Sequence, residues 1–163
     1  MSVQEAKKFD TELALQRAEH LGVLTYWQNK RQDGRLPARR DIDPSEIPRE
    51  ALSSISLVTV EHGGAAEPLF RYRLIGTSIV RYCGRDVTGL TFEDAHEDEE
   101  HLAAHRHFYQ QAVESKDIQF SRSSLMVPGR EYIECARLLL PLANDGCNVD
   151  MILGSLVFEL RNY

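Results

Sequence analysis

The chain has 163 residues, of which 42% are hydrophobic and 27% charged, a composition typical of one globular domain rather than a disordered segment. Its net charge of −6 argues against a general nucleic-acid binder, because such proteins carry an excess of basic side chains. No apolar run reaches the roughly 20 residues that cross a bilayer, and the first residues lack the apolar stretch of a signal peptide. We therefore expect a cytoplasmic protein that binds neither nucleic acid nor membranes.

The first predicted element is an amphipathic helix over residues 9–30. Apolar side chains recur there at spacings of one, three or four, and no proline interrupts them. Its apolar stripe includes Leu13, Leu21, Leu24 and Trp27. Such a stripe has to be covered, either by a second copy of the chain in a homodimer or by the helix folding back on its own sheet. The sequence leaves both arrangements open.

A connector with three prolines, residues 36–48, separates this helix from the first strands, and Pro44 is placed to begin a single helical turn. Strands are predicted for residues 54–62 and 69–75, joined across a glycine-rich loop. In the second strand, bulky apolar residues alternate with Arg71 and Arg73, the pattern of a half-buried strand. We expect these arginines to point outward and pair across the sheet with Glu131, Glu134 or Glu159.

A short helix should follow the second strand, with Thr77 or Ser78 as its cap and Gly84 at its end. Residues 97–115 are predicted as a long helix whose first turn is acidic, as suits the positive end of a helix dipole. Three strands over residues 118–127, 131–142 and 151–160 complete the chain. The order of elements predicts an α+β domain with an antiparallel sheet.

Four segments of the sequence resemble the PAS family, and most closely the stand-alone PAS-like proteins of alphaproteobacteria, once filed as a domain of unknown function. They are Tyr26-Trp27 ahead of LPARRDIDP (residues 36–44), FRYRLIGT (70–77), GRDVTG (84–89), and LLPL (139–142) with MILG (151–154). The resemblance implies a five-stranded antiparallel sheet with helices packed on one face, preceded by the amphipathic helix. Residues 1–40 would then be an N-terminal helix and linker, a candidate dimerisation element, and residues 41–163 the PAS-like domain.

A sheet with helices over one face can enclose a ligand pocket between the two layers. The side chains expected to point inward are Phe70, Tyr72, Leu74, Phe92, His105, Phe108, Tyr109, Phe120 and Leu139. The alternative is that they fill the core completely and leave no room for a ligand. The sequence does not decide between these two arrangements.

Histidines and cysteines are the residues that bear on a cofactor. His101 and His105 lie four apart on the long helix and therefore share one face, but a third metal ligand is not evident. Some PAS sensors bind haem through a histidine on this helix, so the resemblance makes either residue a candidate axial ligand. The flavin-binding branch of the family needs a cysteine in an Asn-Cys-Arg-Phe type motif, which this chain lacks. Cys83, Cys135 and Cys147 show no CxxC spacing and are expected to be reduced thiols.

The glycine-flanked turn contains Gly84, Arg85, Asp86, Thr88 and Gly89. Asp86 and Thr88 are suited to hydrogen bonds within the turn, whereas Arg85 could contact an anionic ligand or a partner.

The sequence contains no recognisable catalytic motif. The resemblance implies a non-catalytic sensor that binds a small ligand or a protein partner and signals through its N-terminal helix. An adaptor that works by protein contacts alone is the alternative. A small enzyme with His105 and Asp94 as an acid–base pair is the third hypothesis.

Overall fold

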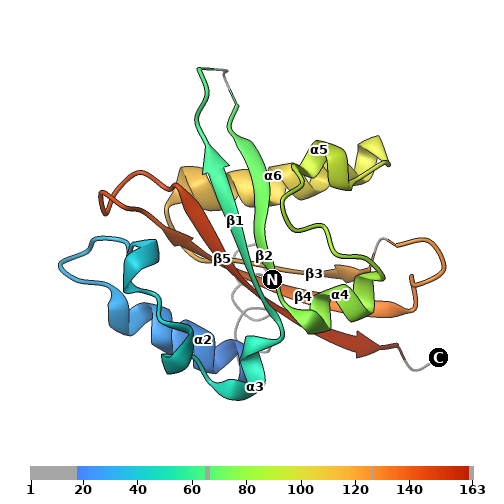
Figure 1. Cartoon of the computed structure of the whole chain (residues 1–163), viewed down its shortest axis with the longest axis horizontal. Coiled ribbons are helices and arrows are strands. Elements are labelled where there is room, and N and C mark those ends of the chain that lie inside the picture. Colours follow the sequence, from blue (N-terminus) through green and yellow to red (C-terminus); the bar gives the residue numbers. More distant parts are fainter. Residues whose placement is uncertain (1–17, 65–66, 126, 162–163) are drawn as a thin grey trace, which may run out of the picture.

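The structure is a computed structural model that describes residues 18–64, 67–125 and 127–161. Five antiparallel strands form a single sheet in the order β2-β1-β5-β4-β3 (Figure 1). The strands are β1 (Ile55–Glu61), β2 (Leu69–Ile75), β3 (Gln119–Ser124), β4 (Ile133–Leu142) and β5 (Met151–Leu160). The helices are α2 (Ala18–Lys30), α3 (Arg49–Leu52), α4 (Thr77–Cys83), α5 (Phe92–Ala95) and α6 (Glu99–Ser115), with single 3-10 turns at Arg39–Asp41 and Pro44–Glu46.

The sheet separates two layers of helix. In Figure 1 the long helix α6 passes behind the sheet, whereas α2 lies in front of it beside α3. The side that faces α6 is called the palm below, and the other side the α2 face. Because both sides are covered, β4 and β5 have long runs of buried residues instead of strict alternation. No helix in the described ranges is long and apolar enough to cross a membrane.

Strand register assigns side chains to the two faces, because residues opposite each other in an antiparallel pair point the same way. Val58 lies opposite Tyr72 in β2 and Ile152 in β5, and Ile152 lies opposite Pro141 in β4. These residues therefore share the palm. One step earlier, Leu57 lies opposite Leu74, so β2 has one residue more than β1 at this point. This irregularity is a β-bulge at Arg73, and it reverses the alternation of the side chains beyond it.

Helix α6 is held at its first turn and near its middle. Asp98 is its N-cap and accepts a hydrogen bond of 2.8 Å from the backbone N–H of His101. The acidic run predicted as a helix start therefore includes the cap itself. Arg106 pairs with Glu93 on α5, and its guanidinium donates to the carbonyl of Pro68 at 3.1 Å. One side chain on α6 thus holds both α5 and the segment that leads into β2.

The strand predictions agree with the structure within a few residues, and β2 and β5 have the predicted bounds. The predicted partners of the β2 arginines were wrong: Arg71 pairs with Glu61 on β1 at 2.9 Å, and Arg73 is exposed. Glu134 and Glu159 pair instead with Arg122. The reason is strand order, because β2 lies at one edge of the sheet and the acidic residues lie near the other.

The predicted cap of α4 was also wrong, because Gly76 is the N-cap. The N–H of Gly76 donates to the carbonyl of Ile55 at 2.8 Å, and the N–H of Ser78 donates to that of Ser53 at 2.9 Å. Carbonyl groups of Ser53, just after α3, and of Ile55, the first residue of β1, therefore accept the backbone N–H groups at the start of α4. A Cβ on residue 76 would lie 2.6 Å from the carbonyl carbon of Ser53, so only glycine fits.

The turn after α4 returns to the outer edge of β2. Tyr72 donates its N–H to the carbonyl of Leu90 at 2.9 Å, and its carbonyl accepts from Gly89 at 2.7 Å. Arg71 forms a β-bridge with Thr91. Gly89 has φ +88°, a conformation that favours glycine. The turn therefore pairs with the edge of β2 before the chain enters α5.

Candidate functional site: an aromatic and histidine cluster in the palm

Five rings pack together in the palm between β2, α5 and α6. Phe92 is fully buried at their centre, and its centroid lies 5.2 Å from Phe70, 4.8 Å from Tyr72, 4.6 Å from His105 and 5.0 Å from Tyr109. Stacked, tilted and edge-to-face rings at these separations attract one another beyond the area they bury. The cluster joins the sheet to both palm helices.

The hydroxyl of Tyr72 connects two histidines across this cluster. Its oxygen lies 2.8 Å from Nε2 of His96, just after α5, and 2.9 Å from Nε2 of His105 on α6. A phenol has one proton, so it donates to one imidazole and accepts from the other. One histidine therefore carries its proton on Nε2 and the other on Nδ1. Binding at either ring would change the hydrogen bond made by the other.

The surroundings favour the neutral form of every group in this network. Desolvation lowers the pKa of His96 to about 4, with a further contribution from the charge of His101. The pKa of His105 lies well below its usual value, first because of desolvation and then because of His96 and Arg137. Burial also raises the pKa of Tyr72 well above its usual value. Near neutral pH the network is an uncharged set of hydrogen bonds.

The structure brings together most of the residues predicted to line the palm. Leu139 is buried in β4 two residues from Pro141 and so shares the palm, and Phe108 packs against the same core beside Tyr109. Phe120 is misplaced in the prediction, since it lies opposite Leu138 and its ring meets His20 of α2 at 6.1 Å on the other face. Leu74 was also misplaced, because the bulge at Arg73 turns it to the α2 face, where it is 42% exposed.

His101 is the third histidine at this end of α6, with its ring centroid 5.6 Å from that of His96. Within the described ranges, no three histidine, cysteine or acidic side chains have an arrangement that could hold a metal ion. His105 is directed at Tyr72, whereas Asp94, its proposed catalytic partner, is exposed on α5.

A protein-family model described as the PAS domain matches residues 16–157 of the chain, from just before α2 almost to the end of β5. The chain belongs to the PAS domain family. No curated protein matches the sequence. Among solved structures, one of a single-residue variant of RsLOV shares 16% identity with a TM-score of 0.47, over 70% of this chain and 66% of that one. The chain thus spans slightly less than two thirds of that protein.

On the other face of the PAS domain, α2 packs directly on the sheet. Trp27 is 1% exposed, and its indole N–H donates to the carbonyl of Pro141 in β4 at 3.0 Å. Leu24 is also buried, whereas Leu21 is 49% exposed and Leu13 lies outside the described residues. Leu24 and Trp27 were therefore wrongly assigned to a dimer surface, because the helix folds back on its own sheet there. Leu21 keeps the exposure that such a surface needs.

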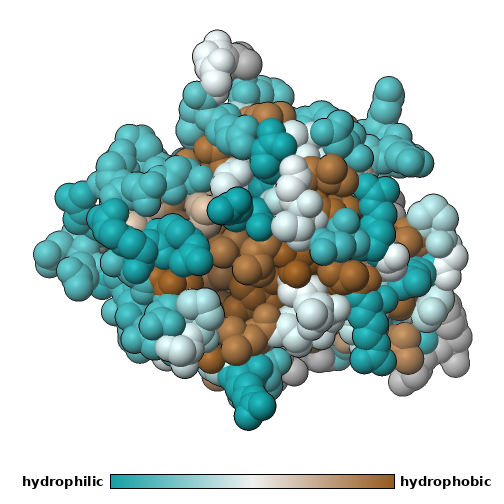
Figure 2. Space-filling model, in the orientation of Figure 1, coloured by the Kyte–Doolittle hydropathy of each residue, from teal (hydrophilic) through white to brown (hydrophobic). Residues whose placement is uncertain are grey.

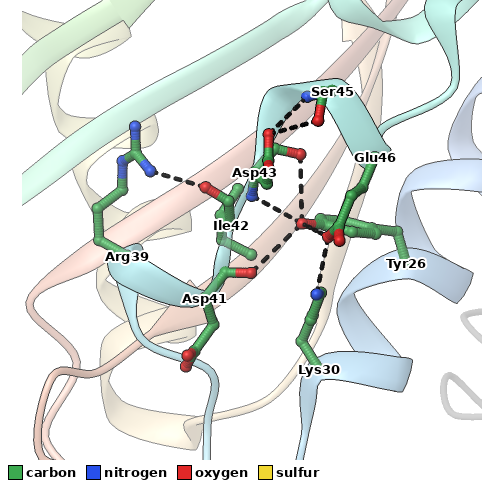
Figure 3. Close-up of polar contacts among 8 residues, drawn as sticks. All are labelled: Tyr26, Lys30, Arg39, Asp41, Ile42, Asp43, Ser45 and Glu46. Carbon is green, nitrogen blue, oxygen red and sulfur yellow. Dashed lines mark hydrogen bonds and ion pairs between the residues drawn. The ribbon is translucent and has the colours of Figure 1, made fainter.

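The connector after α2 is held by the hydroxyl of Tyr26 (Figure 3). This oxygen accepts the N–H of Asp43 at 2.8 Å and lies 2.9 Å from a carboxylate oxygen of Glu46, which also pairs with Lys30 at 2.7 Å. The N-cap carboxylate of Asp43 accepts from Ser45 and starts the 3-10 turn at the predicted Pro44. One phenol therefore ties α2 to the connector ahead of α3.

The glycine-flanked turn uses its polar side chains for its own structure, as predicted. Asp86 accepts from the N–H of Thr88 at 2.9 Å and from its hydroxyl at 2.6 Å. Gly84 ends α4 with φ +87°, and Arg85 is exposed. The polar side chains of Asp86 and Thr88 therefore stabilise the glycine-flanked turn itself.

Two important residues, His96 and Tyr26, were not among the predicted site residues. His96 falls in a short connection between α5 and α6, where no periodic pattern marks the direction of its side chain. Tyr26 precedes Trp27 within the segment that carries the family resemblance, which is the signal that could have indicated its role. Both act through partners distant in sequence.

Proposed function

We propose that this PAS domain is a non-catalytic sensor that receives a small ligand or a protein partner at the palm and passes the change to α2. The observation that carries this proposal is that the palm cluster and α2 lie on opposite faces of the same sheet. Leu139 and Pro141 of β4 face the palm, and the Pro141 carbonyl accepts the indole N–H of Trp27. A shift of β4 would therefore alter a buried contact of α2 directly.

The palm network supplies a means of responding. Tyr72 makes both of its hydrogen bonds to histidines on different elements, His96 after α5 and His105 on α6. A ligand that takes one of these bonds leaves the displaced imidazole in need of a new partner. If the ligand also reverses the direction of the hydroxyl proton, the imidazole that stays bound has to change tautomer. The response is a population shift between two packings of the palm, and α2 reports which packing is occupied.

Hydrogen–deuterium exchange tests this coupling. Tyr72→Phe should increase exchange at the backbone amides of α2, although the substitution lies on the opposite face of the sheet. Tyr132→Phe is the matched control, since Tyr132 is 46% exposed, and it should leave exchange in α2 unchanged. Equal exchange in α2 for wild type and Tyr72→Phe would contradict the coupling.

Native mass spectrometry of freshly purified protein tests separately whether a ligand is bound, because a retained small molecule adds to the measured mass.

A second candidate, a homodimer or adaptor that works through protein contacts, is favoured by the apolar surface on the α2 face. Figure 2 shows apolar residues gathered in the middle of this face and surrounded by hydrophilic ones. Leu21, Leu52 and Leu74 are 49%, 37% and 42% exposed. Leu21→Glu should abolish a dimer measured by sedimentation, whereas Ala104→Glu, at an exposed position of α6 on the other side of the sheet, is the control. A monomeric wild-type protein would contradict the homodimer. Recovery of the same protein partners by wild type and Leu21→Glu would contradict the adaptor.

A further inference from the structure

A polar cleft lies on the molecule away from the palm, where two distant segments meet. The end of α2 and the connector form one wall, and the turn between β4 and β5 forms the other, at the left of Figure 1. Hydrogen bonds join the walls: Leu36 donates its N–H to the carbonyl of Gly146 at 2.9 Å, and Ala143 donates to that of Pro37 at 2.8 Å. The cleft has a volume of about 440 Å³, within the usual range for small-molecule sites.

The lining of this cleft is basic although the whole chain has a net charge of −6. Lys30, Arg35 and Arg40 line it together with a single acidic residue, Asp41. The carboxylate of Asp41 is engaged within the connector, where it accepts the N–H of Ala38 at 2.8 Å. The lining therefore has a formal charge of +2, from three cations and one anion, in an acidic protein.

The three cations differ in how strongly they are engaged. Lys30 pairs with Glu46 at 2.7 Å, and Arg35 donates to the carbonyl of Asp145 and packs against Gly146. Arg40 is exposed, and its guanidinium has a contact of 3.4 Å with the carbonyl of Asn144, which is too long for a strong hydrogen bond. Its planar fork of donors is therefore available to an oxyanion.

We propose that this cleft binds a small phosphorylated metabolite, of about the size of a sugar phosphate or a nucleoside monophosphate. Arg40, supported by Arg35, would hold the phosphoryl group, since arginine matches phosphate with two parallel hydrogen bonds. The amides of Asn29, Gln32 and Asn144 line the remainder and can bond hydroxyl or base groups. This site is distinct from the palm and does not depend on the role proposed for it.

Such a ligand would touch both walls at once. Asn29 and Lys30 belong to the last turn of α2, and Asn144 belongs to the turn that follows β4. Binding would therefore fasten the end of α2 to the sheet and stabilise the folded state. The cleft is suited to controlling how firmly α2 is docked.

The test is isothermal titration calorimetry of the full chain with two probes, AMP and pyrophosphate, at constant ionic strength. We expect saturable binding, a higher melting temperature, and a loss of affinity of roughly tenfold or more in Arg40→Gln. Arg49→Gln removes an exposed arginine on α3, outside the cleft, and should bind like wild type. Arg40→Lys keeps the charge without the fork and should fall between Arg40→Gln and wild type.

The two probes separate recognition of the phosphoryl group alone from recognition of the larger metabolite. Binding of AMP that is tighter than that of pyrophosphate supports contacts from the amide side chains. Binding of neither probe overturns the proposal. An equal loss in Arg40→Gln and Arg49→Gln also overturns it, because the effect would then be one of net charge and not of a site. Circular dichroism of each variant confirms that the fold is intact.

Discussion

The phenol oxygen of Tyr72 on β2 lies 2.9 Å from Nε2 of His105 on α6, which is a direct hydrogen bond between the sheet and the helix that covers it. Tyr72 is 7% exposed and Phe92 packs on its ring, so the bond is shielded from solvent. The only other partner that the described structure gives this hydroxyl is His96. The hydroxyl is therefore central to the polar part of the palm.

Removing this hydroxyl should destabilise the domain. Tyr72→Phe keeps the ring but deprives two desolvated imidazoles of a partner, so we expect the free energy of unfolding to fall by about 1–3 kcal/mol. Urea denaturation followed by circular dichroism measures this change. Tyr132→Phe, at an exposed position, should change the stability by less than about 0.5 kcal/mol. A loss of the same size in both variants would mean that the hydrogen bonds of the palm do not contribute to the free energy of unfolding.

Stability should decrease as the pH falls, because His96 has a pKa lowered to about 4 in the folded chain. Between the ordinary value near 6.5 and about 4, the unfolded chain binds a proton that the folded chain does not. Unfolding then takes up protons, so its free energy falls with pH, by about 1–2 kcal/mol after allowance for solvent screening.

His96→Gln tests this pH dependence. The variant should show a shallower decline of stability between about pH 6.5 and about pH 4.5, measured by urea denaturation at each pH. The control is His107→Gln, which changes an exposed histidine on α6. Its pH profile should follow that of wild type, and identical profiles for all three proteins would exclude His96 as the cause.

Trp27 should contribute to stability through its nitrogen as well as its ring. Trp27→Phe leaves the Pro141 carbonyl without the indole donor and opens a small cavity under α2. We expect a loss of about 1–3 kcal/mol in thermal or urea unfolding. Leu21→Ala, on the same helix but 49% exposed, should cost much less. Equal losses would show that α2 is not anchored through Trp27.

Gly76→Ala should be one of the more damaging single-methyl changes. The added Cβ would meet the backbone of Ser53 and Ile55, which cannot move without separating α3 and β1 from β2. We expect a loss of about 2–4 kcal/mol in the free energy of unfolding. Gly63→Ala is the matched control, because nothing lies within 4 Å of its added Cβ. If Gly76→Ala leaves the free energy of unfolding unchanged, the backbone of Ser53 and Ile55 can move to accommodate the added Cβ.

The sequence predicted the strands well because their signal is local. Alternation in β2 and the glycines around it mark where that strand begins and ends. The faces of Leu74 and Phe120 could not be predicted in the same way. A bulge depends on how two strands pair, and the position of Phe120 depends on which face α2 covers. Both are properties of the assembled sheet.

The candidate sites were predictable only in part, for a similar reason. The aromatic residues of the palm are recognisable from their positions in predicted elements, whereas the role of His96 depends on its approach to Tyr72 across the fold. The basic residues Arg35 and Arg40 lie beside acidic ones in the sequence, which suggests charge balance. In the fold they line a cleft against a distant turn, as the 3.4 Å contact of Arg40 with Asn144, 104 residues further along the chain, shows.

The pairing of residues 89–91 with the outer side of β2 has a consequence for assembly. Tyr72 has both of its backbone groups engaged by that turn, so a foreign peptide cannot extend the sheet there by strand addition. The opposite margin is β3, where Arg122 and its acidic neighbours place charges along the rim. Charged rims discourage edge-to-edge stacking of sheets, which guards the chain against fibril growth.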